Sequence, residues 1–350
     1  SFPLSVQVTD TSGCKGTTNT SVQVFALPTA TLSASPNPIC IDGGMVTITA
    51  SPSTAGGVGT WNGATKVNET SATFDVSTLG TITTPTSQTI SYKYVASAAQ
   101  GLCEMTPATD ITITVNPLPH VVMQSASTCS SIDNVDLRTK MIVSEPTGTG
   151  TFTGYTPATA GVSLSPTGIF THGGNNGTYT ISYSFTSNGC TKVFTETFTV
   201  NANLTPDITA NPGFEVCENQ TINLGISGGP FASQIWSGSA AAYLGGATTI
   251  ATPSFTGALA NTYTISAQVT DANGCSGTAT KTIIVHPIPT VTLSTPNNAH
   301  SVSETTPQII TATISPATTV GTGTWSTNVT KTSETTATFT PSVAGSAGSP

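Results

Sequence analysis

One stretch of this sequence recurs nearly unchanged, and that repetition limits the available folds more than any other feature. Residues 6–33 read VQVTDTSGCKGTTNTSVQVFALPTATLS, and residues 267–294 read AQVTDANGCSGTATKTIIVHPIPTVTLS. Self-similarity at a fixed spacing is the signature of a repeated structural unit. The two copies start 261 residues apart, at positions 6 and 267, so the next question is how many units this distance contains.

Four units can be aligned, with a period of about 87 residues. Each has an early segment in which an aromatic residue lies in a Gly- and Thr-rich setting, and we expect these aromatics in the core: Trp61, Phe152, Trp236 and Trp325. A later segment alternates apolar and polar residues, as a half-buried strand requires: LSVQV, ISYKY, ISYSF and ISAQV. A turn with a cysteine, a Thr-rich segment and a proline-bearing joint complete the unit. The joint prolines are Pro28, Pro119, Pro206 and Pro289.

The composition favours short strands and turns. Charged residues make up 7% and aromatic residues 6% of the 350 residues. No long segment has apolar residues at helical spacing, so we expect almost no helix. Antiparallel patterning, frequent turns and an aromatic on an early strand predict an all-β fold, with tandem seven-stranded Ig-like β-sandwich domains in a linear array.

Charge and hydropathy exclude two classes of partner. The net charge of −8 leaves no basic footprint for phosphates, so no nucleic-acid partner is expected. No apolar run is long enough to span a bilayer, so no membrane span is predicted in this region. No secretion signal opens the sequence, which we expect to be a mature product or an interior fragment.

The segment YTISAQVTDANGCSGTATKTIIVHPIPTVTLS combines a VTDxxGC turn, a Thr-rich strand and a PxP joint. It resembles the Ig-like and PKD-like repeats of giant cell-surface adhesins of the Bacteroidota type, as found in gliding bacteria. The resemblance covers the whole chain. It implies an extracellular, bacterial surface protein and fixes no ligand.

The period predicts three complete domains and two halves. The complete Ig-like domains are residues 29–118, 119–204 and 205–288, and the halves are 1–28 and 289–350. When TPSVAGSAGSP from the end is placed before SFPLSVQVTDTSGC from the start, the result aligns with TPSFTGALANTYTISAQVTDANGC of the preceding unit. We therefore expect identical units to be joined head-to-tail. A continuous chain in which the block recurs is favoured, and strand exchange between subunits is the other possibility.

Seven cysteines occupy two kinds of position. Cys14, Cys103, Cys190 and Cys275 follow the alternating strand, whereas Cys40, Cys129 and Cys217 come just before the second strand. In the last partial unit Ser301 takes the second position. None has the spacing of a zinc site. Their regular placement favours disulfides over free thiols in a secreted chain.

The expected geometry favours pairing between domains. The two kinds of cysteine lie at opposite ends of one sandwich, about 26 Å apart for a strand of about eight residues, whereas a disulfide needs Cα atoms within about 7 Å. Successive domains abut end to end, which predicts the pairs Cys40 with Cys190, Cys129 with Cys275, and Cys217 with Cys14 of the next block. Cys103 stays unpaired because its partner position is Ser301. An intradomain scheme, which would join Cys40 to Cys103, leaves Cys14 over instead.

The sequence contains few candidates for catalytic or metal-binding residues. The segments GGVGTWNG and GTGTFTG superficially resemble phosphate loops but lead into no helix, so a structural role is favoured. Asp10 and Asp271 in the VTDxxG turns are weak Ca²⁺ candidates, and an ordinary turn is favoured for both. No HExxH or Cys/His motif is found. We predict no cofactor and no enzyme activity.

The functional prediction is therefore mechanical. The chain is expected to be a structural repeat region of an extracellular filament or giant surface adhesin, forming a stiff head-to-tail rod. The alternative is a carbohydrate- or ligand-binding Ig-like array, which requires surface aromatics grouped on one face. A weaker alternative is an accessory region of an enzyme.

Overall fold

The computed structural model describes residues 1–296, 299, 303–316 and 321–340. The chain divides into two compact units, residues 1–200 and 201–350. In the described ranges, the helices are α1 (Leu137–Met141) and three short 3-10 segments. The lack of helical periodicity in the sequence explains this small helix content.

Residues 30–116 form a sandwich of two four-stranded sheets, with the orders β3-β5-β8-β7 and β4-β10-β9-β6. The first sheet consists of β3 (Ala30–Ser35), β5 (Met45–Pro52), β8 (Ser71–Asp75) and β7 (Thr65–Asn68). The second consists of β4 (Ile39–Cys40), β10 (Thr109–Asn116), β9 (Thr86–Val95) and β6 (Val58–Asn62). This is the strand order of an Ig-like sandwich whose first strand is divided between the two sheets, here as β3 and β4.

Alternation along facing strands builds the core of this first sandwich. Every second residue of β5 is buried up to Ala50, and the second half of β9 follows the same rule. Val46 and Ile48 of one sheet share a buried cluster with Ile90 and Ile113 of the other. Thr, Ser and Gln fill most outward positions, as a period of two requires.

Residues 122–201 form the second sandwich. Its main sheet has the order β12-β19-β18-β15, with β12 (Ala126–Cys129), β19 (Cys190–Asn201), β18 (Gly177–Ser187) and β15 (Thr149–Thr156). Two smaller sheets face it, formed by β13 (Val135–Asp136), β17 (Ile169–Thr171) and β16 (Ser163–Leu164), and by β11 (Val122–Met123) and β14 (Ile142–Ser144). Aromatic rings fill the core, with the Phe170 ring centroid 5.2 Å from that of Tyr179 and 5.4 Å from that of Phe198.

Residues 2–22 form a separate hairpin in the same unit. Its strands, β1 (Phe2–Thr9) and β2 (Lys15–Val22), pair antiparallel from Phe2 opposite Val22 to Thr9 opposite Lys15. Every residue of both strands is exposed. The hairpin therefore has no core of its own.

The second unit begins with a third sandwich, at residues 207–286. One sheet contains β20 (Asp207–Asn211), β22 (Ile222–Ser227) and β24 (Ser254–Phe255). The other has the order β21-β26-β25-β23, with β21 (Glu215–Cys217), β26 (Ser276–His286), β25 (Asn261–Thr270) and β23 (Ser233–Ser237). Trp236, Ile265 and Ile283 are buried together in its core.

A single sheet follows the third sandwich. Its order is β27-β28-β30-β29, with β27 (Thr290–Ser294), β28 (Gln308–Ser315), β30 (Thr336–Phe339) and β29 (Thr330–Lys331). This order matches β3-β5-β8-β7, one of the two sheets of the first sandwich. Ser301 lies outside the described residues.

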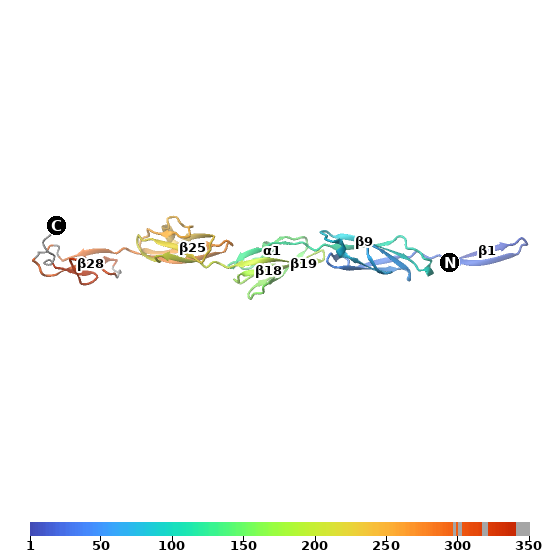
Figure 1. Ribbon diagram of the computed structural model, residues 1–350, viewed down its shortest axis with the longest axis horizontal. Helices are drawn as coiled ribbons and strands as arrows, with labels where there is room; N and C mark the ends of the chain where they lie inside the picture. Colours follow the sequence, from blue (N-terminus) through green and yellow to red (C-terminus); the bar gives the residue numbers. More distant parts are fainter. Residues whose placement is uncertain (297–298, 300–302, 317–320, 341–350) are drawn as a thin grey trace. The chain divides into compact units, whose positions relative to one another are not determined.

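The repeated sheet orders confirm the prediction of an all-β, Ig-like tandem fold. In Figure 1 the labels β9, β18 and β25 mark equivalent strands in the three sandwiches. Each of these strands pairs antiparallel with the next long strand of its sandwich, β10, β19 or β26. The label β28 marks the sheet at residues 290–339.

Candidate functional site: the joint between two sandwiches

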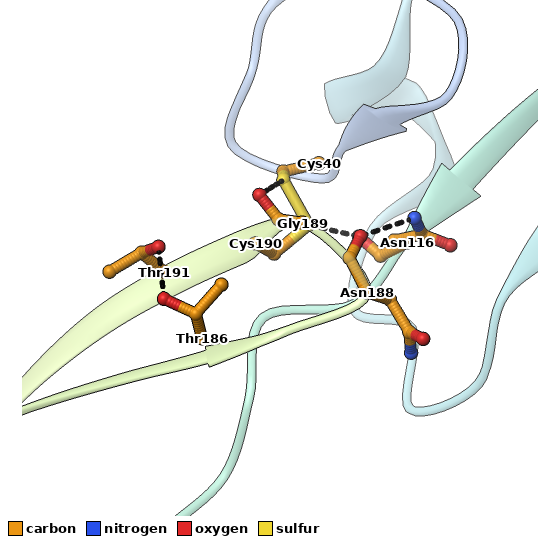
Figure 2. The surroundings of a disulfide bond; sticks show 7 residues. All are labelled: Cys40, Asn116, Thr186, Asn188, Gly189, Cys190 and Thr191. Carbon is orange, nitrogen blue, oxygen red and sulfur yellow. Dashed lines mark hydrogen bonds between the residues drawn. A yellow bond between two sulfur atoms is a disulfide. The ribbon is translucent and has the colours of Figure 1, made fainter. Parts of the chain in front are cut away.

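A disulfide joins the first sandwich to the second. Cys40, at the end of β4, is bonded to Cys190, the first residue of β19, with a Cα–Cα distance of 5.6 Å (Figure 2). This distance is typical of protein disulfides. The pair is the one expected from the sequence, and it excludes the intradomain bond between Cys40 and Cys103.

Strand pairing explains why these two cysteines meet. β4 runs parallel to the end of β10, with Cys40 opposite Asn116, so Cys40 lies where the chain leaves the first sandwich. The turn between β18 and β19 brings Cys190 to the same place. That turn needs two left-handed residues, which Asn188 (φ 51°) and Gly189 (φ 79°) supply. An asparagine–glycine pair is the usual solution for such a hairpin.

A hydrogen bond accompanies the disulfide. The Asn116 side-chain amide donates to the backbone carbonyl oxygen of Asn188 over 2.8 Å, and Asn116 is buried. The Cys190 Sγ atom lies 3.8 Å from the carbonyl oxygen of Asn116, and the Cys40 Sγ atom lies 3.8 Å from that of Gly189 (Figure 2). The backbone of each sandwich therefore lies in contact with the disulfide.

A groove of about 590 Å³ lies beside the disulfide. Its walls include Ile41, Ile82, Pro117, Pro119, His120 and Lys192. Two prolines in the linker fix φ and remove two backbone donors, which stiffens this segment. The groove is thus a feature of the joint, and its mostly apolar walls contain no cluster of catalytic groups.

The other cysteines divide into two states. Cys129 and Cys275 are both disulfide-bonded, and their pairing with each other stays a prediction. Cys14, Cys103 and Cys217 are free thiols, with Cys14 and Cys217 exposed and Cys103 half-buried. The bond between Cys217 and Cys14 of the next block also stays a prediction.

The joint before the first sandwich is built differently. Phe25 lies against Gly101, close enough that a Cβ atom at position 101 would come 2.9 Å from Phe25 Cδ2. The same hypothetical atom would lie 3.7 Å from the Cys103 sulfur. Gly101 has a φ of 75°, so both its conformation and its contact with Phe25 require glycine. An aromatic contact thus lies beside the cysteine that was expected to be unpaired.

The two weak calcium candidates cap turns. The Asp10 carboxylate accepts hydrogen bonds from the backbone amides of Ser12 and Cys14, at 2.9 and 2.8 Å. Asp271 does the same for Asn273 and Cys275, at 2.9 and 2.8 Å. These are Asx turns, which explains the VTDxxGC motif locally. Within the described ranges, no group of three or more His, Cys, Asp and Glu side chains could hold a metal ion.

The four aromatics expected in the core differ in burial. Phe152 is 4% and Trp236 is 2% exposed. Trp61 is half-buried and contacts Tyr92, with ring centroids 4.5 Å apart. Trp325 is half-buried as well, and the described residues around it, between 290 and 339, form one four-stranded sheet.

Sequence reasoning missed three functional contacts: Asn116 at the disulfide, Phe25 at Gly101, and a polar cluster at Arg138. The first two occupy the same aligned position, three residues before the joint prolines Pro119 and Pro28, but asparagine and phenylalanine share no chemistry that would have marked it. In the cluster, Arg138 donates to Glu145 over 2.6 Å and to the Tyr183 hydroxyl over 2.9 Å. The Tyr183 hydroxyl donates to Glu145 over 2.6 Å.

Comparisons with known proteins give no family. No family model matches the chain, and no curated protein does. Among solved structures, it is similar to the protocadherin GammaB4 extracellular domain, at 10% identity and a TM-score of 0.29, over 82% of this chain and 56% of that one. It is also similar to an I-band fragment of titin, at 10% identity and a TM-score of 0.35, over 76% of this chain and 100% of that one.

A third similar structure is Sidekick-1 immunoglobulin domains 1–5, at 10% identity and a TM-score of 0.28, over 81% of this chain and 66% of that one. Likenesses this weak carry no inference about function. None of the helices in the part that the structure describes is long and apolar enough to cross a membrane.

Proposed function

We propose that this chain is a mechanical repeat region of an extracellular filament or giant surface adhesin of the bacterial type that its sequence resembles. The observation that carries the proposal is the disulfide between Cys40 and Cys190, which fastens one sandwich to the next. Disulfides of this kind persist in oxidising, extracellular surroundings. The role assigned is mechanical rather than catalytic.

The joint limits both bending and extension. Domains on linkers normally pivot, because the interfaces between them are small and polar. Here the disulfide, the Asn116–Asn188 hydrogen bond and the prolines of the linker act at one place. The prolines restrict the linker backbone, and the disulfide prevents the two ends from separating.

No observation favours the ligand-binding alternative. A carbohydrate site of that kind needs exposed aromatic rings grouped on one face. Among the residues that the structure describes, Phe2 is the one exposed aromatic side chain. No Trp, Tyr or Phe side chain is among the described residues that line the groove beside the disulfide.

The stiffness of the joint can be tested directly. Spin labels carried by non-natural amino acids at the exposed positions Val67 and Val193 would report the distance between the two sandwiches by pulsed electron resonance. We expect a narrow distribution in the oxidised protein and in a Cys103→Ser control, and a broader one in Cys40→Ser. Equal widths in all three proteins would contradict a stiffening role for the disulfide.

A further inference from the structure

We propose that the β1–β2 hairpin of a second copy of this 350-residue sequence completes the single sheet at residues 290–339. In that complex, Cys14 of the hairpin forms a disulfide with Cys217. The inference rests on the proposed mechanical function, because it names the partner that extends the linked domains. Four observations carry it: two exposed apolar faces, a pre-positioned edge, a shared register and two free thiols.

The hairpin exposes an apolar face that its equivalents bury. The exposed side chains are those of Phe2, Leu4, Val6, Val8 and Val22 of the hairpin and of Val24 just after it, each at least 48% exposed. In the third sandwich, the aligned residues of β25 and β26 are at most 6% exposed: Tyr263, Ile265, Ala267, Val269, Ile283 and Val285. A two-stranded hairpin is only marginally stable in water. The apolar face of the hairpin therefore corresponds to the part of a sandwich core that β25 and β26 contribute in the third sandwich.

The sheet at residues 290–339 exposes the complementary apolar face, the one that a second sheet covers in a complete sandwich. Val291 and Leu293 of β27 are 55% and 66% exposed. They line an open groove of about 470 Å³ together with Ala312, Ile314 and Trp325. In the first sandwich the equivalent sheet is covered by β9, and Ile48 and Ala50 of β5 are 0% and 3% exposed.

The edge that would receive the hairpin is already in place. Glu334 accepts a hydrogen bond from the Gly323 backbone amide and forms an ion pair with Lys331 at 2.8 Å. This positions the segment that carries Trp325. The same arrangement occurs in the first sandwich, where Glu69 accepts from the Gly59 amide and pairs with Lys66. There the segment is β6 and pairs with β9, whereas residues 321–326 are not assigned to a strand.

The complete sandwiches define the register of the missing pair. The early aromatic lies opposite the middle apolar residue of the alternating strand in each: Trp61 opposite Tyr92, Phe152 opposite Tyr183, and Trp236 opposite Ala267. In the hairpin, the aligned residue is Val6. The proposed complex therefore places Val6 opposite Trp325.

The free cysteines fit the same complex. Cys217 lies opposite His286 at the end of a parallel strand pair, as Cys40 lies opposite Asn116. Cys14 lies at the hairpin turn, as Cys190 does in the second sandwich. Both Cys14 and Cys217 are exposed thiols. Bond formation transfers two electrons and two protons from the two thiols to a small-molecule disulfide, such as oxidised glutathione, which is reduced to two thiols.

The contact joins two different surfaces of the chain, so it is heterologous, and it produces an open filament where the rotation between copies does not close into a ring. Each copy offers one hairpin and one open sheet. Copies are thus expected to assemble into linear polymers.

Sedimentation of the full chain under reducing conditions tests the docking itself. We expect association that increases with protein concentration and is lost in Val6→Glu, which puts a charge on the apolar face. The matched control Gln7→Glu changes the opposite face of the same strand and should associate like the wild type. A protein that stays monomeric at all concentrations, or a Val6→Glu protein that associates normally, would overturn the proposal.

Cross-linking tests the partner and the register. With oxidised glutathione, the wild type and Cys103→Ser should give a covalent ladder in multiples of 35.3 kDa on a non-reducing gel. Cys14→Ser alone and Cys217→Ser alone should give no ladder, and a mixture of these two should give a covalent dimer and nothing larger. A dimer from the double variant Cys103→Ser/Cys217→Ser, which keeps the free thiol of Cys14 but not those of Cys103 and Cys217, would mean that Cys14 pairs with Cys14, which contradicts the proposal.

These outcomes are independent of the proposed stiffening role. Val6→Glu leaves Cys40 and Cys190 untouched, so the distance distribution between labels at Val67 and Val193 should not change. A broad distribution in the oxidised protein would refute the stiff joint while leaving self-assembly to be judged by sedimentation and the gel.

Discussion

Asn116 holds the end of one sandwich to the turn of the next by donating a side-chain hydrogen bond to the Asn188 carbonyl oxygen over 2.8 Å. Asn116 is 7% exposed, so solvent cannot easily replace this bond. The contact lies at the disulfide because β4 and β10 run parallel, with Asn116 opposite Cys40. The disulfide and the Asn116–Asn188 hydrogen bond therefore connect the two sandwiches at the same place.

Replacement of Asn116 by alanine should weaken this joint. The loss of one buried hydrogen bond costs about 1 kcal/mol, and this cost should be most visible in the reduced protein, in which the disulfide no longer holds the turn. Hydrogen exchange of residues 187–190 would measure the change. Asn19→Ala, at an exposed position of β2, is the control, and equal exchange in both variants would contradict the assignment.

The cluster of Arg138, Glu145 and Tyr183 should stabilise the second sandwich. Glu145→Gln removes the acceptor charge that Arg138 and Tyr183 share. We expect a loss of about 1–2 kcal/mol in the free energy of unfolding, toward the low end because Arg138 is partly exposed. Urea unfolding followed by hydrogen exchange of β18 measures it. Asp42→Asn, at an exposed site, should change nothing; an equal loss there would point to net charge instead.

Two tyrosines should make the sandwiches sensitive to alkali. Burial raises the pKa of Tyr92 to about 12, with further contributions from Tyr94 and Glu69. Burial also raises the pKa of Tyr183 to about 12, and its hydrogen bond to Glu145 adds to the effect. Because the unfolded pKa is about 10, the stability that depends on the neutral phenols is complete below pH of about 10. It is lost as the pH rises toward 12.

Thermal unfolding between pH 9 and 12 would check this, with tyrosinate absorbance recorded in parallel. We expect the melting temperature to fall and the absorbance of the buried tyrosines to appear only on unfolding. Ionisation of all seven tyrosines near pH 10 without unfolding is the outcome that contradicts it.

Phe25 should stabilise the loop that carries Cys103. Phe25→Ala removes a half-buried ring from Gly101, which should lower the free energy of opening this loop by about 1–2 kcal/mol. Gly101→Ala should act in the same direction, since alanine disfavours a φ of 75°. Hydrogen exchange of residues 96–103 is the measurement. Leu27→Ala, at an exposed linker position, serves as the control, and it should leave the exchange unchanged.

The fold could be predicted because period and alternation are local properties of the sequence. Alternating strands such as ISAQV fix which face is buried, and the positions of Cys40 and Cys190 indicated which ends of the first two sandwiches meet. The contacts of Asn116 and Phe25 could not be predicted, since they depend on how a turn of one domain meets a strand end of another. The contacts between Arg138, Glu145 and Tyr183 could not be predicted either, because these residues span 45 positions of the sequence and meet only in the folded sandwich.

In the proposed mechanical role, tension passes from the first sandwich to the second through the Cys40–Cys190 bond. Stretching of single molecules by their two ends tests it, in a Cys129→Ser background so that the other interdomain bond predicted within one chain, Cys129 with Cys275, is absent. The bond shields a segment with a sequence separation of 150 residues, which at about 3.3–3.6 Å per residue is roughly 500 Å of chain. We predict that reduction, or Cys40→Ser, lengthens the fully stretched molecule by this amount. Equal lengths with and without the bond would show that it carries no load.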